Sequence, residues 1–258
     1  LQLFYDLVKE SDVVISNFGA GVPQKLKIDY DNLKKVNPKI ITCSISGFGS
    51  DGPGSKRPAF DQVAQAYGGG MSITGEDANH PMRAGIPIGD LGGGMFAVMG
   101  IQSALLERER SGEGQHVDIS MVDVQISLLN YMATMHFMSG EDPFPIGNSH
   151  FVHVPYNTYS TQNGHLVIAV ITDNFWQNLK QVVNFEGFEK EEFDGQPGRL
   201  AAKDFIDGTL DEIFSTNTTE HWLALLNEKR IPAAPVNKFS QALADEQIRR
   251  INKTNGKA

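Results

Sequence analysis

The sequence predicts an α/β fold that is built around a parallel β-sheet. Strand-like runs occur at residues 12–16, 39–46 and 115–120, and the first two are rich in β-branched side chains. Segments with the polar start signals of helices separate these runs. Strands that alternate with helices along a chain are typical of parallel α/β units, because the helix returns the chain to the edge where the next strand begins.

The longest predicted element is a helix over residues 90–110. Its apolar side chains recur at spacings of four, three, three and four, the period of a helix face turned toward a core, at Leu91, Met95, Val98, Ile101 and Leu105. Asp90 stands directly before this pattern, and aspartate is among the residues that cap helix N-termini. We therefore expect Asp90 to be the N-cap and the apolar stripe to be buried.

Glycines at positions 92, 93 and 94 come next to this carboxylate. Each glycine costs about 0.5–1 kcal/mol of stability relative to alanine inside a helix, so the presence of three glycines here requires an explanation. One interpretation is a plain cap with close packing of the helix against a neighbour. The other is that Asp90 is a carboxylate nucleophile, favoured as an anion by the helix N-terminus, with the amides of Gly92 and Gly93 supporting an oxyanion. The residues alone leave both interpretations open.

A second helix is predicted over residues 121–138, directly after the third strand. The stretch that follows, 140–155, is rich in Gly, Pro, Asn and His, a composition that suits a boundary or crossover. Residues 157–171 are then predicted to form a hairpin that turns at Asn163-Gly164, because this dipeptide favours two-residue hairpin turns.

Helical segments dominate the rest of the chain. One is predicted over residues 219–229, where Asn217 and Glu220 have the spacing of a capping box ahead of apolar residues. No internal repeat or low-complexity segment is evident. The chain begins at Leu1 without a methionine and ends in a polar stretch, so we expect it to be an internal piece of a longer protein.

Composition narrows the class of protein. With 258 residues, 40% hydrophobic and 21% charged, the chain has the make-up of an ordinary globular protein. A net charge of -9 argues against nucleic acid or an anionic membrane surface as a partner, and no hydrophobic run has the length of a membrane span. The single cysteine, Cys43, rules out a disulfide within the chain and favours a reducing compartment, the cytoplasm.

Two glycine-containing loops are candidate binding sites. Residues 47–52 fit the Gly-x-Gly-x-x-Gly pattern after a predicted strand, but Pro53 and Pro58 keep the segment a loop where a dinucleotide fingerprint needs a helix. Residues 17–21 lie between a strand and a helix with Lys25 one turn in, where free amides and a cation suit phosphate or carbonyl groups. A plain turn with a solvated lysine is an equal alternative there.

Metal and hydrolase signatures are missing from the sequence. The seven histidines form no convincing cluster, and His150-x-x-His153 lies in the Pro/Gly-rich stretch where the helix needed for a zinc pair is not expected. No Gly-x-Ser-x-Gly elbow or Walker A sequence occurs. We predict no metal site.

A series of motifs, taken in order, resembles the family III CoA-transferases, the CaiB/BaiF and formyl-CoA transferase group. The likeness extends over nearly the whole chain, and several motifs in one order at similar spacing are far more specific than any one alone. The matching segments are residues 12–18, 37–41, 44–53, 57–61, 65–69, 85–90, 104–115, 117–121 and 231–237.

The resemblance implies an acyl-CoA:carboxylate CoA-transferase. In this family the aspartate at the position of Asp90 is the nucleophile, which forms an acyl-aspartyl anhydride and then an aspartyl-CoA thioester. CoA is a cosubstrate, no cofactor is permanently bound, and the substrates are an acyl-CoA and a carboxylic acid. Asn17 and Phe18 match positions that line the CoA site, Lys25 falls where a basic residue is common, and Met121 matches a residue near the pantetheine arm.

Two departures from the pattern bear on function. Racemases of the same fold use a histidine where this chain has Phe60, and phenylalanine cannot move a proton, so an acyl-CoA racemase or epimerase is the disfavoured alternative. The glycine-run loop of formyl-CoA transferase has no counterpart between residues 140 and 156, which argues against the formyl and oxalate substrate pair. A non-catalytic CoA-binding fragment is the third candidate.

The resemblance also implies the architecture. We expect a large Rossmann-like α/β domain, CoA-binding and catalytic, that is partly covered by residues 1–121, and a linker helix over residues 122–145. A smaller α+β domain over residues 146–235 and the start of a return linker over residues 236–258 complete the expectation. Relatives form interlaced homodimers, so we expect a second copy of the chain as partner, and neither nucleic acid nor membrane.

Overall fold

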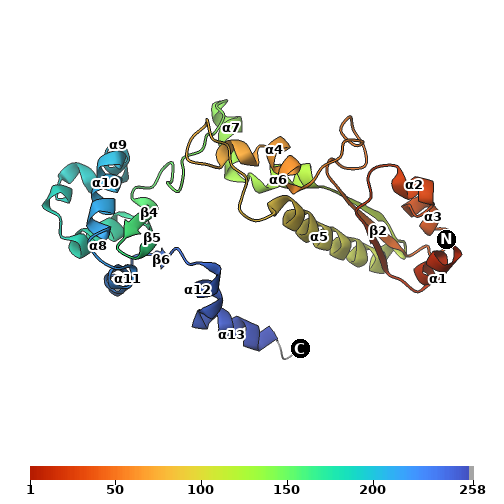
Figure 1. The fold of residues 1–258 in the computed structure, drawn as a ribbon. Coiled ribbons are helices and arrows are strands. Elements are labelled where there is room, and N and C mark those ends of the chain that lie inside the picture. Colours follow the sequence, from red (N-terminus) through yellow and green to blue (C-terminus); the bar gives the residue numbers. More distant parts are fainter. Residues whose placement is uncertain (256–258) are drawn as a thin grey trace. The chain divides into compact units, whose positions relative to one another are not determined.

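The computed structural model describes residues 1–255 and divides the chain into two units (Figure 1). The first unit is formed by residues 1–147, and the second begins at residue 148. Each unit has a three-stranded sheet of its own. The two units are therefore described separately below.

The sheet of the first unit is parallel, as predicted. Its strands are β1 Val13–Ser16, β2 Ile41–Ser46 and β3 His116–Ser120, in the order β1-β2-β3. Val13 is paired with Ile41, and Thr42 is paired with His116 across the other edge of β2. The predicted strands therefore begin and end within two residues of the observed ones, and the α/β class is confirmed.

Short helices connect the first two strands. α1 Gln2–Lys9 precedes β1, whereas α2 Val22–Leu26 and α3 Tyr30–Leu33 lie between β1 and β2. Val8, Leu33 and Ile40 form a small fully buried core beneath them. The phenol of Tyr30 donates a hydrogen bond to the carbonyl of Gly114, which holds this connection against the turn that enters β3.

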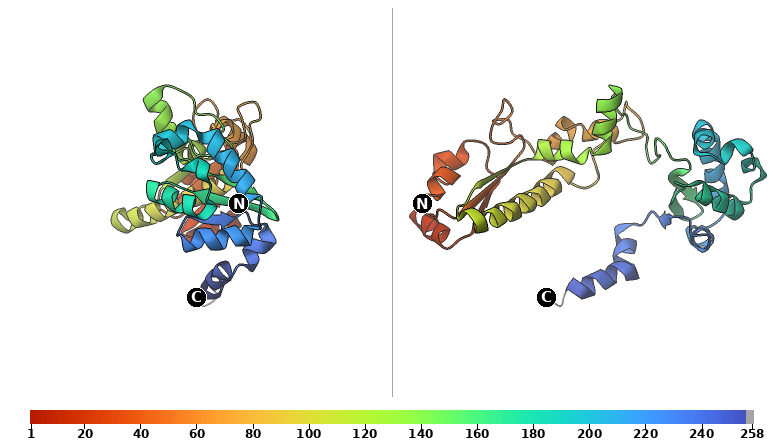
Figure 2. Two further views of the ribbon diagram at one scale, coloured as in Figure 1. Left: turned by 90° about the vertical axis from the view of Figure 1, so that its left-hand side faces the viewer. Right: turned by 180° about the vertical axis from the view of Figure 1, so that it is seen from behind.

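Helix α5 Ile88–Ser111 lies along one face of this sheet (Figure 2). Its buried residues are all small: Gly89, Gly92, Gly93, Ala97 and Ala104. A Cβ atom at Gly92 would lie 2.8 Å from Val124 Cγ1, and one at Gly100 would lie 2.7 Å from Val117 Cγ1. The glycines therefore allow the helix backbone to approach the sheet and the following helix closely.

The predicted buried face of α5 is wrong. Leu91, Met95 and Val98 are 50%, 59% and 55% exposed in this chain. The regular spacing of large apolar residues was taken for the core face, but the close approach to the sheet leaves room only for glycine and alanine. The first three residues of the apolar stripe therefore face outward from the first unit, whereas Ile101 and Leu105 are partly buried.

Three further helices complete the first unit. α4 Asp61–Tyr67 is followed by the 3₁₀ turn η1 Gly70–Ile73, and α6 Met121–Leu128 and α7 Tyr131–Ser139 follow β3. The single helix predicted over residues 121–138 is therefore two helices. Asn130 separates them with φ +51°, a backbone conformation that an α-helix does not contain.

The second unit contains an antiparallel sheet. The predicted hairpin is formed by β4 Tyr156–Thr161 and β5 Gly164–Ala169, and β6 Ala233–Pro235 is added beside β5. Gly164 is paired with Thr161, so the turn residues are Gln162 and Asn163, one position earlier than predicted. The side-chain carbonyl of Asn163 accepts a hydrogen bond from the amide of Thr219 at 2.9 Å, which ties this turn to the start of the helix at Thr219.

The described helices of the second unit are α8 Asp173–Val183, α9 Gln196–Ala201, α10 Lys203–Phe214, α11 Thr219–Glu228, α12 Phe239–Ala244 and α13 Glu246–Asn255, with 3₁₀ turns η2 Glu186–Phe188 and η3 Glu191–Phe193. Of these, α10 contacts β4, and α11 contacts β5 and β6. Helix α11 begins where it was predicted to begin. Its cap is Thr218, whose hydroxyl accepts a hydrogen bond from the amide of His221, and not Asn217.

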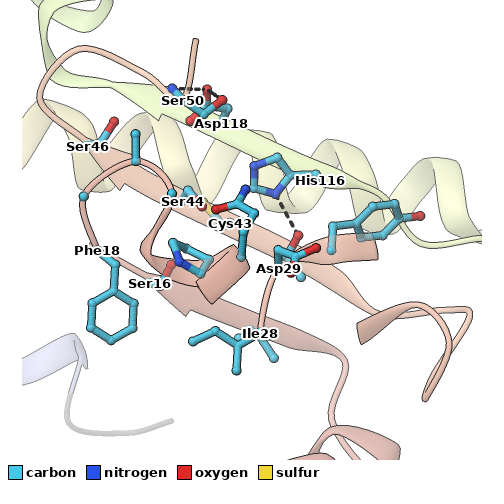
Figure 3. A pocket seen from close by; sticks show the side chains of 18 of the residues that line it. Ser16, Phe18, Ile28, Asp29, Cys43, Ser44, Ser46, Ser50, His116 and Asp118 are labelled. Atoms are coloured by element: carbon cyan, nitrogen blue, oxygen red, sulfur yellow. Dashed lines mark hydrogen bonds between the residues drawn. The ribbon is translucent and has the colours of Figure 1, made fainter. Parts of the chain in front are cut away.

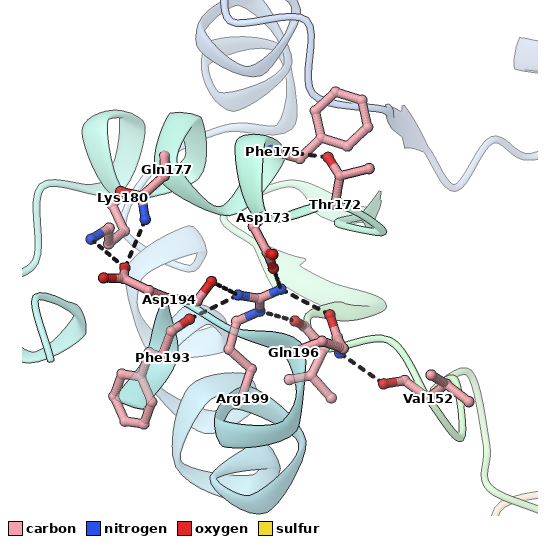
Figure 4. Close-up of polar contacts among 11 residues, drawn as sticks. Val152, Thr172, Asp173, Phe175, Gln177, Lys180, Phe193, Asp194, Gln196 and Arg199 are labelled. Atoms are coloured by element: carbon pink, nitrogen blue, oxygen red, sulfur yellow. Dashed lines mark hydrogen bonds and ion pairs between the residues drawn. The ribbon is translucent and has the colours of Figure 1, made fainter. Parts of the chain in front are cut away.

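The core of the second unit is mainly aromatic and leucine-rich, and it encloses one arginine. Arg199 is fully buried, its guanidinium lies over the ring of Trp176, and Figure 4 shows the polar groups around it. Its guanidinium donates five hydrogen bonds of 2.7–3.0 Å, to the carbonyls of Val154, Phe193 and Asp194 and to the side chains of Asp173 and Gln196. One side chain thus joins the start of this unit to α8, α9 and η3.

Candidate functional site

A cavity of about 560 Å³ in the first unit brings together most of the predicted site residues. Its wall includes Asn17, Phe18, Asp90 and Met121, which come from the loop after β1 and from the starts of α5 and α6. Ile45 and Phe60 add apolar surface. Elements that are far apart in the sequence therefore place one carboxylate in a largely apolar hollow.

Asp90 is not the N-cap of α5, which corrects the prediction. The helix begins at Ile88, the cap position is Pro87, and Asp90 is the third residue of the first turn. The amide of Gly89 donates to Asp61 Oδ1 at 2.8 Å, and the amide of Asp90 lies 3.4 Å from the same oxygen. Asp61 therefore caps the helix from the start of α4, and the side chain of Asp90 is free of that task.

Asp61 is itself held in place by a buried glutamine. Its second oxygen accepts a hydrogen bond from Gln65 Nε2 at 2.7 Å, and Gln65 Oε1 accepts one from the amide of Ala84 at 2.9 Å. This chain of contacts links α4 to the segment that leads into α5. The positive end of the helix dipole favours negative charge at this place, where Asp61 and Asp90 both lie.

The predicted oxyanion role of Gly92 and Gly93 does not fit the structure. Both residues lie inside α5, where each amide bonds to the carbonyl four residues earlier. A Cβ atom at Gly92 would lie 2.8 Å from Val124 Cγ1, whereas one at Gly93 would lie 3.5 Å from Ile45 and from Met121, an ordinary van der Waals contact. The structure thus favours the packing interpretation for Gly92.

The loop after β1 forms one side of the cavity. Asn17 and Phe18 lie in its wall, and Gly21, with φ +81°, ends the loop and begins α2. Lys25 is exposed on α2 and does not line this cavity. Of the predicted CoA-binding residues, Asn17, Phe18 and Met121 are therefore brought together with Asp90, and Lys25 is not.

A second cavity of about 270 Å³ is lined in part by the same loop (Figure 3). Phe18 and Ser46 contribute to both cavities. Asp118 Oδ2 accepts hydrogen bonds from the amide and the hydroxyl of Ser50, at 2.8 and 2.6 Å, and Thr42 Oγ1 lies 2.7 Å from a ring nitrogen of His116. Sequence analysis did not single out this polar wall, although hydroxyl residues alternate along β2.

Arg57 is a site residue that sequence analysis missed. It lines the same cavity as Asp90, and its guanidinium carbon lies 4.9 Å from the ring centroid of Phe48 and 5.0 Å from that of Tyr67. Arg57 and Asp61 both belong to the segment 57–61 that was recognised as a motif. The signal was therefore present, but nothing in the sequence tied that segment to the helix that carries Asp90.

The structure also bears on the segments that were considered for metal and dinucleotide binding. Within residues 1–255 there is no group of three or more His, Cys, Asp or Glu side chains that is arranged to hold a metal ion. No helix opens at Gly52, so the segment 47–52 is a loop, as predicted. None of the helices described here is long and apolar enough to cross a membrane.

Comparison with known proteins adds to this geometry. The family model described as CoA-transferase family III matches residues 1–254. The chain belongs to CoA-transferase family III. Its α/β architecture, with one parallel and one antiparallel sheet, agrees with a solved structure of a CaiB/BaiF family protein from Brucella suis. That structure has a TM-score of 0.88 and 35% sequence identity, over 96% of this chain and 66% of that chain.

Curated relatives of this family III chain are named as CoA-transferases. A succinate–glutarate CoA-transferase of Agrobacterium fabrum is 36% identical over 94% of this chain and 61% of its own length. A succinyl-CoA:mesaconate CoA-transferase of Haloarcula marismortui is 36% identical over 96% of this chain and 63% of its own length. The chain therefore spans less than two thirds of the length of these relatives.

Proposed function

We propose that the protein is an acyl-CoA:carboxylate CoA-transferase in which Asp90 is the nucleophile. The observation that carries the proposal is the position of Asp90: it lines an apolar cavity with Asn17, Phe18 and Met121, and its side chain does not cap its helix. Membership of the family and the names of the relatives support the reaction class.

The proposed reaction conserves the thioester bond. The Asp90 carboxylate attacks the thioester carbonyl, the C–S bond breaks, and CoA leaves as a thiolate while an acyl-aspartyl anhydride forms. The thiolate then attacks the aspartyl carbonyl, which releases the donor acid and leaves an aspartyl-CoA thioester. The acceptor carboxylate attacks this thioester to form a second anhydride, and the thiolate finally attacks the acceptor's acyl carbon. Acceptor acyl-CoA leaves and Asp90 is restored.

The cavity wall suits such intermediates. Ile45, Phe60 and Met121 present apolar surface beside Asp90. In the proposal the bound substrates displace water from this surface, which protects an anhydride from hydrolysis. The helix N-terminus favours the anionic carboxylate that must attack. In the proposal CoA lies along the loop of Asn17 and Phe18, with Met121 beside its pantetheine arm and Lys25 near its phosphates, and CoA enters and leaves as a substrate.

Homodimer formation is part of the proposal. The outward stripe of α5 and the exposed side chains of Phe137 and Met138 on α7, 82% and 84% accessible, are large apolar surfaces. Monomeric proteins rarely leave such surfaces contiguous and open to water. We propose that a second copy of the chain covers them in an interlaced dimer. The buried lone cysteine, Cys43, supports a reducing compartment, the cytoplasm.

The expected domain limits are also kept as a proposal. Residues 1–121 are assigned to the large domain, 122–145 to a linker helix, 146–235 to the small domain and 236–258 to the return linker. Two observations support these limits: the second unit begins at residue 148, and β6 ends at Pro235.

A racemase of the same fold is the weaker alternative. Such an enzyme needs a second acid–base group across from the aspartate, and Phe60 occupies the corresponding position in the cavity wall. Among the described residues that line the cavity, Asp90 and Arg57 are the charged ones, and arginine does not release a proton at neutral pH. The geometry therefore favours transfer of CoA over racemisation.

Trapping the covalent intermediate tests the proposal. The intact protein is mixed with acyl-CoA donors, treated with hydroxylamine or borohydride, and analysed by peptide mass spectrometry. We expect modification on the peptide that contains Asp90 and none in the Asp90→Asn variant. The Asp51→Asn variant, which removes an exposed carboxylate outside the cavity wall, serves as the matched control.

The other outcomes distinguish the alternatives. Absence of any modification together with deuterium exchange at the α-carbon of an acyl-CoA would favour the racemase. Tight CoA binding without modification or exchange would identify a binding protein without turnover. Either result would overturn Asp90 as a transferase nucleophile.

A further inference from the structure

The cavity that holds Asp90 contains one positive and one negative side chain. Asp90 and Arg57 are the charged residues of its wall, and the other lining residues are apolar or neutral. The ion pairs of the described residues include neither of the two, so their charges lie further than 4.0 Å apart. A ligand that fills this cavity therefore meets an anion at one point and a separate, unneutralised cation at another.

Two aromatic rings position the guanidinium of Arg57. The rings of Phe48 and Tyr67 lie 4.9 and 5.0 Å from the guanidinium carbon, and the two rings meet edge to face with centroids 5.0 Å apart. Cations are attracted to the faces of aromatic rings, so these contacts orient an otherwise flexible side chain. Arg57 is thereby held in advance of any ligand.

The donors of Arg57 remain free in this arrangement. Within residues 1–255 the guanidinium makes no hydrogen bond to another group, although its five N–H donors radiate in the plane of the group. The two rings stand nearly at right angles to each other, at 83°, so they enclose the guanidinium from two sides without taking up its N–H groups in hydrogen bonds. An open edge of guanidinium matches the two oxygens of a carboxylate in a bidentate pair.

The loop that carries Arg57 is packed tightly against its support. A Cβ atom at Gly54 would lie 3.1 Å from a carbon of the Phe48 ring, and one at Gly47 would lie 2.3 Å from Ala59 Cβ. Glycine at these two positions lets the loop fold onto Phe48 and keeps Arg57 beside the cavity. The neighbouring Lys56 is exposed and is not part of the cavity wall.

We propose that Arg57 binds a second carboxylate of the substrate, so that the site selects dicarboxylic acids and their mono-CoA thioesters. One carboxyl group reacts at Asp90 while the other pairs with Arg57. This inference rests on the proposed CoA-transferase function and adds to it the substrate class and the residue that selects it. A CoA phosphate is the competing oxyanion for the same cation, and the experiment below separates the two.

The experiment compares chain-matched acids in the intact protein. The donors are succinyl-CoA and butanoyl-CoA, and the acceptors are glutarate and pentanoate; the first of each pair carries a second carboxylate and the other does not. Transfer of CoA from each donor to each acceptor is measured in the wild type and in the Arg57→Met, Arg57→Lys and Lys56→Met variants. We expect the wild type to prefer glutarate. Arg57→Met should lower kcat/KM for glutarate by roughly 10- to 100-fold, chiefly through KM, because hydrogen bonds to a charged group are lost. Transfer from butanoyl-CoA to pentanoate should fall far less than transfer to glutarate, and a urea unfolding curve equal to that of the wild type shows that the variant is folded.

The two remaining variants sharpen the result. Arg57→Lys should restore only part of the glutarate preference, because lysine keeps the charge but not the fork of donors. Lys56→Met removes a positive charge one residue away and should behave as the wild type does.

Several results would overturn the inference. A wild type that uses pentanoate as well as glutarate, or an Arg57→Met variant that loses both acids equally, would show that Arg57 does not select a second carboxylate. A KM that rises equally for succinyl-CoA and butanoyl-CoA would assign Arg57 to a CoA phosphate.

If the wild type transfers CoA to neither acid and no Asp90 adduct is trapped, the proposed function fails and the inference fails with it. If an Asp90 adduct forms but the Arg57→Met variant keeps the wild-type preference, only the inference fails.

Discussion

The carboxylate of Asp61 lies 3.4 Å from the backbone amide of Asp90 and accepts a shorter hydrogen bond from the preceding amide, that of Gly89. The cap of α5 is thus supplied by the helix before it. Capping the helix and presenting a carboxylate to the cavity are thus done by two different aspartates. Asp61 satisfies the free amides of the helix, whereas Asp90 keeps its carboxylate available to the cavity.

Replacing Asp61 with alanine should weaken both stability and turnover. Loss of an N-cap side chain costs about 0.5–2 kcal/mol, and Gln65 Nε2 also loses its acceptor. We therefore expect the free energy of unfolding, measured in urea, to fall by an amount near the upper end of this range. The start of α5 is no longer fixed, and kcat should therefore fall more than KM rises. Asp51→Ala removes an exposed carboxylate and is the control. Equal unfolding curves for the Asp61 variant and the wild type would contradict the capping role.

Replacing Asp90 with asparagine should leave stability nearly unchanged and abolish CoA transfer. Because Asp90 is exposed and is not the cap, we expect the free energy of unfolding to change by less than about 0.5 kcal/mol. Transfer requires the carboxylate itself, since an amide cannot form the anhydride. Urea unfolding and a CoA-exchange assay measure the two effects. Wild-type turnover in this variant would refute the nucleophile.

Two glycines of α5 should respond oppositely to alanine. A Cβ atom at Gly100 would lie 2.7 Å from Val117 Cγ1, so Gly100→Ala should destabilise the protein by about 1–3 kcal/mol through overpacking. Gly94 has open space around the Cβ position, so Gly94→Ala should stabilise by up to about 1 kcal/mol through helix propensity. Thermal unfolding of the two variants gives the comparison. Effects of the same sign would show that α5 does not approach β3 as described.

Removing Arg199 should strongly destabilise the second unit. Arg199→Met leaves the carbonyls of Val154, Phe193 and Asp194 without their donor, and unsatisfied buried groups cost about 1–3 kcal/mol each, so the loss should exceed about 3 kcal/mol. Asp173→Asn removes the charge of a partner that is 65% exposed and should cost less than about 1 kcal/mol. Denaturant unfolding that is followed by tryptophan fluorescence reports on Trp176 beside the arginine. A small effect of Arg199→Met would mean that water replaces the lost donors.

Much of the fold could be predicted from local patterns. The three parallel strands, the long helix, the hairpin and the start of α11 each depend on a few neighbouring residues, and their positions were predicted to within a few positions. Errors appeared at single positions within these elements. Asn130, with φ +51°, divides a segment whose sequence is typical of one helix, and the hairpin turn lies one residue earlier than the Asn163-Gly164 dipeptide indicates.

The candidate site, like the fold, could be predicted only in part from the sequence. Asp90 was recognisable from its helix start and its motif, and Asn17, Phe18 and Met121 from resemblance to the family. Arg57 and Asp61 were not recognised as site residues, because their roles depend on α4 lying beside the start of α5. The buried face of α5 was misread for a similar reason: large apolar residues signal burial, but not whether the same chain buries them.

The sequence by itself determined the α/β class, the family and the candidate nucleophile, because these follow from periodicity and from motifs that are contiguous along the chain. Only the tertiary structure decided that Asp61 caps the helix of Asp90, that glycine and alanine face the sheet, and that Arg57 shares a cavity with the carboxylate. The physical reason is that hydrogen bonds, close packing and charge act over a few ångströms in space. Residues that are distant in sequence acquire such interactions only when the fold brings them together.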